Sequence, residues 1–313
     1  MSSDTPHILV TEPIPQKAIS YLEKYAKVTV GEKGTYHSEK QLAADIPQYD
    51  ALLCMLSTPV TEKVLSRGEK LRIVANFAVG YDNIDVESAK KDNIKVANTP
   101  NVLTEACGDY AMGLLMALSR KLKEAENYLR DGKFNGWEPL GFLGMELRGR
   151  TLGIIGMGRI GQAFAYRAKA FGMDIIYHNR TRVIKKIEDD LEATYFSDHK
   201  KLAATCDVLS LNCPLTPETH HLVDSTLLNS MKKHALLINI SRGAVIDEPE
   251  LAKALHNKTI GGAALDVFEK EPTPEVKLLM QSKLSLSPHI GGATDEAQSR
   301  IGTELAQQII ELS

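Results

Sequence analysis

A glycine-rich stretch between Thr151 and Gly172 constrains the fold of this chain more than any other feature of its sequence. An apolar run from Leu152 to Ile155 leads into Gly156-Met157-Gly158-Arg159-Ile160-Gly161, after which apolar residues recur at helical spacing. This order is typical of a strand, a tight turn and a helix. Gly156 permits the turn, Gly158 lets the backbone approach a pyrophosphate, and Gly161 lets the helix pack close to the strand. The stretch therefore predicts a dinucleotide site at a helix N-terminus.

The composition excludes several classes of partner. With 313 residues the chain has room for two domains, and 43% hydrophobic and 25% charged residues are typical of a globular protein. A formal net charge of −3 gives no electrostatic reason to expect nucleic acid or an anionic membrane surface as a partner. Because no apolar run reaches the length of a membrane span and no secretory leader is evident, we expect a cytoplasmic protein.

The cysteines point to a reducing compartment and not to a metal. Cys54, Cys107, Cys206 and Cys213 form no CxxC pair, and we expect reduced, buried thiols. Cys206 and Cys213 lie near His220-His221, a combination that suggests a zinc site, but the spacing of these residues matches no usual zinc motif. We therefore expect no metal site.

Short apolar runs alternate with helical patterns in two series. Alternation of this kind predicts parallel sheets covered by helices on both faces. The strands expected in the first series are His7–Thr11, Lys27–Val30, Asp50–Met55, Arg72–Asn76 and Ile94–Ala97. Those expected in the second series are Leu152–Ile155, Asp174–His178, Val208–Asn212, Ala235–Ile240, Gly262–Asp266 and Leu284–Ser287.

A long helix is predicted between the two series, from about Val102 to Arg130, because apolar residues recur there at three- and four-residue steps. Gly113 within it favours close packing against another helix. Two interpretations stay open, a helix of the domain core and a helix of a dimer interface. In the loop that follows, Trp137 is expected to pack against other residues, with a place in a substrate pocket as the alternative.

Ionisable residues stand where strands of the second series end. Arg242 follows one strand, Asp266 closes the next, His289 follows the last, and Glu271 lies shortly after Asp266. Because the carboxyl ends of parallel strands share one edge, these side chains should gather at the edge that carries the glycine-rich turn.

Their chemistry suits one reaction class. Nicotinamide exchanges a hydride with a carbonyl carbon, and a histidine can exchange the accompanying proton near neutral pH. A neighbouring carboxylate stabilises the charged imidazole, and arginine offers two donors to a substrate carboxylate. The set predicts interconversion of a 2-oxo acid and a 2-hydroxy acid.

Five motifs occur in a fixed order along the chain. They are Phe77-Ala78-Val79-Gly80-Tyr81-Asp82-Asn83-Ile84-Asp85, the glycine-rich turn, Ile238-Asn239-Ile240-Ser241-Arg242-Gly243, Leu265-Asp266-Val267-Phe268 with Glu271-Pro272, and Pro288-His289-Ile290-Gly291-Gly292-Ala293-Thr294. Through them the chain resembles the D-isomer-specific 2-hydroxyacid dehydrogenase family over nearly its whole length, and it is most similar to the glyoxylate/hydroxypyruvate reductase type. The resemblance implies a Rossmann-type doubly wound cofactor domain and a smaller flavodoxin-like α/β domain.

The resemblance also implies roles for single residues. His289 would donate the proton, Arg242 would clamp the substrate, and Glu271 would pair with His289. Asp266 would hold the nicotinamide carboxamide. The further substrate contacts would be Leu56, Val79 and Gly80, and the further cofactor contacts Arg159, Ile160, Cys213, Ile240 and Gly291.

Domain limits and assembly follow from the same resemblance. It implies a substrate domain of residues 1–98 plus 288–313 and a dinucleotide-binding domain of residues 99–287. It further implies a homodimer formed through the helix at about residues 102–130.

The cofactor type is predicted from the end of the second strand of the dinucleotide unit. An enzyme that uses NAD usually places a carboxylate there for the ribose 2′-hydroxyl. This chain instead has Asn179-Arg180-Thr181-Arg182, which favours the 2′-phosphate of NADP(H), with NAD(H) possible if the arginines only face solvent.

Two further functions compete with the reduction of glyoxylate or hydroxypyruvate. A 2-ketogluconate reductase, or a reductase of another 2-keto acid, would use the same residues. A corepressor-like or regulatory protein that binds NAD(H) would have the same fold without turnover, but the presence of Arg242, Glu271 and His289 favours an enzyme.

Overall fold

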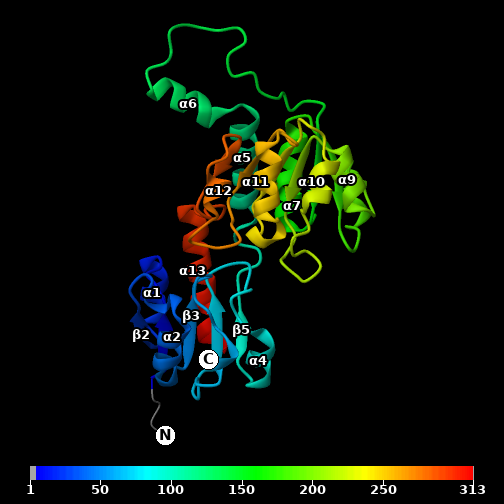
Figure 1. Cartoon of the computed structure of the whole chain (residues 1–313). Helices are drawn as coiled ribbons and strands as arrows, with labels where there is room; N and C mark the ends of the chain where they lie inside the picture. Colours follow the sequence, from blue (N-terminus) through cyan, green and yellow to red (C-terminus); the bar gives the residue numbers. More distant parts are fainter. Residues whose placement is uncertain (1–4, 313) are drawn as a thin grey trace. The chain divides into compact units, whose positions relative to one another are not determined.

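The computed structural model describes residues 5–312, and the chain divides into two compact units. The first unit takes in the residues up to Leu103 together with those from Ala293 onward, and the second runs from Thr104 to Gly292. In Figure 1 the first unit is blue to cyan with the red helix α13 (Asp295–Leu312), and the second runs from teal to orange.

The first unit is built on a five-stranded parallel sheet with the strand order β2-β1-β3-β4-β5, which is flavodoxin-like. Successive side chains alternate between the faces of a strand, so Ile8 and Leu9 belong to different core clusters. The strands are β1 (His7–Val10), β2 (Lys27–Val30), β3 (Ala51–Cys54), β4 (Ile73–Asn76) and β5 (Lys95–Ala97). The helices are α1 (Gln16–Leu22), α2 (Glu39–Asp45), α3 (Glu62–Leu65), α4 (Val86–Lys91) and α13, with short 3₁₀ turns at Thr35–His37 and Ile46–Gln48.

Helix α13 returns from the end of the chain to complete this unit. Its buried residues Ile301, Leu305 and Ile309 recur at four-residue steps and join the core cluster that contains Ile8. A Cβ added at Gly302 would lie 2.9 Å from the Cβ of Ala18, so α13 and α1 pack closely.

The second unit is built on a seven-stranded parallel sheet ordered β12-β11-β10-β9-β6-β7-β8. Counted along this unit, the first strand lies in the middle and the order reverses beside it, as in a Rossmann fold. The strands are β6 (Thr151–Ile155), β7 (Asp174–His178), β8 (Thr194–Tyr195), β9 (Val208–Leu211), β10 (Leu236–Asn239), β11 (Gly262–Leu265) and β12 (Leu284–Leu286).

Helices cover both faces of this sheet. Side chains of α5 (Thr104–Ser119), α7 (Arg159–Ala170) and α8 (Lys185–Leu191) join one core cluster. The other cluster receives side chains from α9 (His199–Thr205), α10 (Ser225–Ser230), α11 (Glu248–His256) and α12 (Val276–Leu279). The prediction of a doubly wound α/β fold with a second, flavodoxin-like sheet is confirmed, and all the expected strands are present. The two-residue strand β8 was not predicted.

Both unit boundaries lie a few residues later than the domain limits expected from the sequence. The first falls where α5 begins at Thr104. The second falls after Gly292 because the backbone N–H groups of Ile290 and Gly291 donate to the Asp266 carboxylate, which holds this segment, with His289, to the second unit.

The expected continuous helix from Val102 to Arg130 is wrong, because the chain breaks after α5 and α6 (Leu122–Arg130) begins anew. Lys121 adopts a left-handed φ of 54°, and the Ser119 carbonyl accepts from the N–H of Met145 instead of from the next helical turn. Within the described chain, nothing lies within 4 Å of a Cβ added at Gly113, so no close contact requires this glycine. A Cβ at Gly108 would lie 2.9 Å from Ala163 on α7, so the close packing is there.

Trp137 does not pack into this chain as expected, since it is 85% exposed. Helix α6 has no buried residue, and together with the loop that follows it stands away from the body of the second unit (Figure 1). Between residues 5 and 312, no helix has both the length and the apolar character needed to cross a bilayer.

Candidate active site

The glycine-rich turn follows β6 and has the geometry that its sequence predicted. Gly156 has a φ of +97°, and a Cβ there would lie 2.5 Å from the Cys213 nitrogen, so only glycine fits. A Cβ at Gly161 would lie 2.5 Å from the Gly156 carbonyl oxygen, which requires a glycine at the start of α7. At Gly158, in contrast, an added Cβ has no neighbour within 4 Å. The open side of the turn is therefore at Gly158, beside Arg159 and Ile160 in the first turn of α7.

A groove of about 510 Å³ lies beside this turn. Its walls come from the ends of β6, β7 and β9, where the strand order reverses and where α/β sheets usually bind ligands. Among its lining residues are Gly156, Gly158, Asn179, Arg180, Thr181 and Cys213. The Asn179 side-chain oxygen also accepts from the Met157 N–H at 2.6 Å, which fixes the end of β7 to the glycine turn.

The four residues after β7 do not all face the groove. Arg180 and Thr181 line it, whereas Arg182 makes a two-pronged ion pair with Glu188, with bonds of 3.0 and 2.8 Å. The pKa of the Glu188 carboxyl is lowered by these bonds from Arg182 and by a hydrogen bond from Tyr177. The Arg182 guanidinium also lies over the Tyr195 ring, 5.1 Å from its centroid. Arg180 is thus the arginine of this segment that the groove presents.

The cysteines are free and buried or half-buried, as expected from the sequence. Burial raises the pKa of the Cys54 and Cys206 thiols to about 12 and that of the Cys107 and Cys213 thiols to about 11. None of them is a reactive thiolate at neutral pH.

Asp266, at the end of β11, anchors the segment that carries His289. The residue is 1% exposed, and its Oδ1 accepts from the Ser287 hydroxyl at 2.7 Å and the Ile290 N–H at 2.8 Å. Its Oδ2 accepts from the Gly291 N–H at 2.8 Å. These bonds hold His289, whose φ of 56° lies in the left-handed region.

His289 and Glu271 are hydrogen-bonded to each other, as the sequence predicted. The Nδ1 of His289 lies 2.9 Å from the Oε2 of Glu271, while the Oε1 of Glu271 accepts from the Phe268 N–H at 3.0 Å. Burial alone would raise the pKa of the Glu271 carboxyl, but these two hydrogen bonds and the nearby Arg242 charge leave it lowered. The carboxylate is therefore ionised, and the imidazole Nε2 is the nitrogen not engaged with Glu271.

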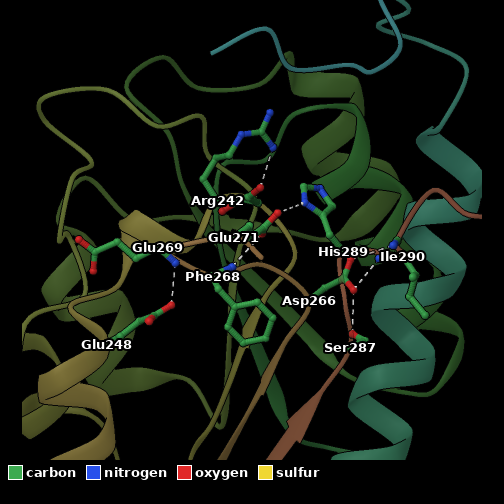
Figure 2. Close-up of polar contacts among 11 residues, drawn as sticks. Arg242, Glu248, Asp266, Phe268, Glu269, Glu271, Ser287, His289 and Ile290 are labelled. Atoms are coloured by element: carbon green, nitrogen blue, oxygen red, sulfur yellow. Dashed lines mark hydrogen bonds and ion pairs between the residues drawn. The ribbon is translucent and has the colours of Figure 1, made fainter. Parts of the chain in front are cut away.

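Arg242 follows β10 and lies beside these two residues (Figure 2). The buried Asn239 shapes the turn that presents it, because its side chain donates to the Arg242 carbonyl and accepts from the N–H and hydroxyl of Ser241. One guanidinium nitrogen donates to the Ser241 carbonyl at 2.8 Å. Ile240, in the same turn, is half-buried against the core.

Sequence reasoning missed three residues that support this group. Asn239 was the only polar residue in an apolar strand, which is a weak indication of a bracing role. A Cβ added at Gly243 would lie 1.8 Å from the Phe268 carbonyl carbon, so this glycine lets the Arg242 and Glu271 segments approach. Glu248, 3% exposed, accepts from the Glu269 N–H at 2.7 Å. The contacts of Gly243 and Glu248 join residues far apart in sequence, so periodicity could not reveal them, whereas those of Asn239 lie within its own turn.

The remaining predicted substrate contacts lie in the first unit, at the carboxyl ends of β3 and β4. Val79 and Gly80 form a loop held by hydrogen bonds from Asn98 and Asn76 to their carbonyls, both at 2.6 Å. The N–H groups of Val79 and Gly80 donate to no other residue within the described range 5–312. Leu56 follows β3 and is half-exposed.

A parallel sheet of this order, with a glycine turn and a groove at the point of reversal, defines a Rossmann-type dinucleotide-binding protein. Residues 112–291 match the NAD binding domain of the D-isomer specific 2-hydroxyacid dehydrogenases. The chain is 43% identical to a glyoxylate reductase of Thermococcus litoralis, over 97% of this chain and 93% of that protein. It therefore belongs to the D-isomer specific 2-hydroxyacid dehydrogenase family.

Solved structures agree with this assignment. An NADPH-dependent glyoxylate/hydroxypyruvate reductase from Sinorhizobium meliloti, in complex with NADP and malonate, is 35% identical with a TM-score of 0.88, covering 98% of this chain and 93% of that one. A Thermus thermophilus protein is 37% identical with a TM-score of 0.91, covering 98% and 96%. The chain is an oxidoreductase that reduces a 2-oxo acid to a 2-hydroxy acid with a nicotinamide dinucleotide.

Proposed function

We propose that this chain is an NADPH-preferring reductase of small 2-oxo acids of the glyoxylate and hydroxypyruvate type, giving the D-2-hydroxy acid where the product is chiral. The observation that carries the proposal is the group of Arg242, Glu271 and His289 at the sheet edge that also carries the glycine groove (Figure 2). The relatives named glyoxylate reductase support the same substrate class.

His289 is the proton donor of the reaction in this proposal. The cofactor supplies a hydride to the carbonyl carbon when bound. The carbonyl oxygen then needs a proton, which His289 donates from Nε2 while Nδ1 stays hydrogen-bonded to Glu271. The ionised carboxylate of Glu271 stabilises the charged imidazole and fixes its orientation.

Substrate binding is assigned to two sets of groups. Arg242 pairs with the substrate carboxylate, since a guanidinium offers two parallel donors. The N–H groups of Val79 and Gly80 bind the same carboxylate, and Leu56 lines the pocket. In this assignment residues 1–98 with 288–313 form the substrate domain and residues 99–287 form the dinucleotide-binding domain. Asp266 would hold the nicotinamide carboxamide, and Gly291 would be a further cofactor contact.

The NADPH preference rests on the residues of the groove. No carboxylate follows β7 at the position where NAD enzymes bind the ribose 2′-hydroxyl, and Arg180 with Thr181 line the groove there. We assign the 2′-phosphate to Arg180, Thr181 and Asn179. Arg182 contributes only if it leaves Glu188.

A panel of 2-oxo acids assayed with NADPH and with NADH tests substrate class and cofactor together. We expect the highest kcat/KM for glyoxylate and hydroxypyruvate, at least about tenfold higher with NADPH than with NADH. A preference for 2-ketogluconate would replace the substrate assignment, and equal or better use of NADH would overturn the cofactor assignment.

The variant His289→Ala tests the proton donor and separates turnover from simple binding. Loss of general acid catalysis lowers kcat by roughly 10²–10⁴-fold. NADPH affinity, measured by fluorescence titration, should stay unchanged. A variant that kept most of its rate would contradict the role of His289.

A cytoplasmic homodimer completes the proposal. The free thiols fit a reducing compartment. Exposed apolar side chains gather on α6 and the loop that follows, and these are Leu122, Leu129, Phe134, Trp137, Leu140, Phe142 and Leu143. A second copy covering this arm would remove them from water.

A further inference from the structure

A second cluster of metal-binding side chains lies in the second unit, apart from Arg242, Glu271 and His289. It consists of His220, His221 and Glu269, whose ligand atoms all lie within 4.8 Å of one another. We propose that these three side chains bind one divalent transition-metal ion of the zinc class. The cysteines whose spacing argued against zinc in the sequence are not part of this cluster.

His221 has the arrangement of a metal ligand. Its Nε2 lies 3.4 Å from the Oε1 of Glu269, and this buried atom has no hydrogen-bond partner in the part of the chain that the structure describes. Its Nδ1 faces the Oδ2 of Asp247 at 3.8 Å. A histidine that binds a metal usually presents one ring nitrogen to the ion while a carboxylate orients the other. Asp247 is placed for that supporting role.

The neighbouring groups complete a ligand set. The rings of His220 and His221 are stacked, with centroids 4.0 Å apart and planes inclined by 24°. Two imidazoles and one carboxylate, with water in the fourth position, form a set that Zn²⁺ accepts. Tetrahedral zinc with bonds of about 2.0–2.1 Å needs ligand atoms about 3.4 Å apart. Since His220 and Glu269 are exposed, rotation of their side chains can close the remaining distance.

The backbone holds the three ligands in place before any ion arrives. The N–H of His221 donates to the Ala244 carbonyl at 2.8 Å, which keeps His221 at a left-handed φ of 50°. The N–H of His220 donates to the Thr216 carbonyl at 2.9 Å, and that of Glu269 to Glu248 at 2.7 Å. A site that is organised in advance loses less conformational entropy on binding.

Two further acidic side chains approach the cluster. The Oδ2 of Asp247 lies 3.8 Å from the Nδ1 of His221, and the Oε1 of Glu248 accepts from the Glu269 N–H at 2.7 Å. Figure 2 shows the Glu269 side chain directed away from Glu271 and His289, so the proposed ion and the substrate would occupy different places.

An ion at this cluster would connect two segments. His220 and His221 belong to the loop after β9, whereas Glu269 stands two residues before Glu271. Coordination would fasten the segment that carries Glu271 to that loop. A bound ion would therefore limit the mobility of Glu271, which the proposed function places beside His289.

The test is a titration of the full-length chain, treated with a chelator and then desalted, in the absence of cofactor and substrate. Zn²⁺ binding is followed by calorimetry, and Co²⁺ binding by its visible absorption. We expect one saturable equivalent. His220→Ala and Glu269→Gln should each weaken binding by at least about tenfold. His256→Ala removes an exposed histidine of α11 in the same unit and should leave the affinity unchanged.

Two results would overturn the site. One is the lack of saturable Zn²⁺ binding by the unaltered chain. The other is a Zn²⁺ affinity of His220→Ala and Glu269→Gln that equals the affinity of the unaltered chain. Because the readout is metal binding without substrate, failure here leaves the reductase assignment intact, and failure of the reductase assays leaves the metal site intact.

Discussion

His289 shows how one residue depends on others for its position. Its backbone adopts a left-handed φ of 56°, which costs a non-glycine residue about 1–3 kcal/mol. The neighbouring N–H groups of Ile290 and Gly291 donate to Asp266, and the ring donates to Glu271, so the conformation is over-determined. The side chain is thereby oriented before a substrate binds, which lowers the cost of reaching the reactive geometry.

Glu271→Gln tests this orientation. An amide keeps the size of the side chain and can still accept a hydrogen bond, but it lacks the negative charge that stabilises a charged imidazole. We therefore expect kcat to fall about 10–100-fold with NADPH affinity unchanged. Because the pKa of Glu271 is lowered, its carboxylate stays ionised below the ordinary glutamate range. The pairing with His289 is therefore lost only as the pH falls through that lowered value.

The measurement is the pH profile of kcat/KM for both forms. Protonation of Glu271 should lower kcat/KM on the acid side of the profile of the unaltered protein, and this decline should be absent from the profile of Glu271→Gln. Glu275→Gln, an exposed position nearby, serves as the control and should change neither kcat nor the pH profile of kcat/KM. A loss of less than twofold in Glu271→Gln would mean that His289 works without this partner.

At the scale of elements, the close approach of two turns decides whether the site exists. Gly243 begins the 3₁₀ turn Gly243–Val245 directly after Arg242, and its Cα faces the backbone of Phe268 and Glu269. The turn after β10 and the segment after β11 can touch only because no side chain stands between them. This contact brings Arg242 toward Glu271.

Gly243→Ala should separate the two turns. Its Cβ would lie 1.8 Å from the Phe268 carbonyl carbon and 2.2 Å from the Glu269 nitrogen, so backbone must move. We expect a fall in kcat of more than about tenfold and a lower Tm. Gly113→Ala is the matched control, since its Cβ meets nothing within 4 Å. Replacing glycine by alanine inside a helix raises the stability of the helix by up to about 1 kcal/mol, so this variant should keep its activity without a fall in Tm. Full activity in Gly243→Ala would contradict the tight contact.

Asp207 secures the starts of two strands. Its Oδ2 accepts from the Thr151 N–H at the start of β6, and its Oδ1 accepts from Lys232 and His234. Burial alone would raise the pKa of this carboxyl, but the hydrogen bonds lower it from 3.8 to about 2. The stabilisation is therefore complete above the unfolded pKa and is lost as the pH falls through the folded pKa.

Asp207→Asn should cost roughly 2 kcal/mol of unfolding free energy at pH 7. The difference from the unaltered chain should shrink between pH 4 and pH 2, a window that follows from those two pKa values. Denaturant unfolding at several pH values measures it. Asp189→Asn breaks an exposed ion pair with Lys185 and should change stability by less than about 1 kcal/mol. A pH-independent difference would show that charge is not the cause.

At the scale of the whole molecule, the arm formed by α6 and residues 131–143 buries none of its side chains against the rest of the described chain. Trp137 is 85% exposed and Leu140 80% exposed, and the arm surrounds an apolar hollow of about 360 Å³. Exposure of so many large apolar groups in one place is typical of an interface. Helix α5 contributes buried residues to the domain core, whereas α6 contributes none, so the dimer interface stays a proposal for α6.

The double variant Leu129→Glu/Trp137→Glu should convert a dimer to a monomer. Charged side chains buried without partners oppose association. By light scattering, the unaltered protein should have about twice the mass of one chain, which is 34.4 kDa, and the double variant should have the mass of a single chain. Ile184→Glu, an exposed apolar position outside the arm, should leave the mass unchanged. A monomeric unaltered chain would contradict the dimer, and a dimeric double variant would place the interface elsewhere.

The sequence by itself determined the class of fold and the glycine turn, and it predicted which ionisable residues gather at one sheet edge. Short apolar runs that alternate with helical patterns indicate parallel sheets, because a strand covered by helices on both faces must be apolar throughout. Gly156 and Gly161 were assigned correctly because their roles depend on neighbours within a few residues. Arg242, Asp266 and His289 could be grouped since the ends of parallel strands share an edge.

Only the tertiary structure decided the rest. The pairing of Arg182 with Glu188 and the bracing by Asn239 are local contacts, but they depend on side-chain orientations that the apolar pattern does not specify. The break between α5 and α6, where Ser119 meets Met145, and the approach of Gly243 to Phe268 depend on contacts between segments far apart in the chain. The cluster of His220, His221 and Glu269 arises in the same way. Local sequence sets strand and helix preference through short-range sterics, whereas the partner of a charged or polar side chain is set by which segments the folded core brings within hydrogen-bond reach.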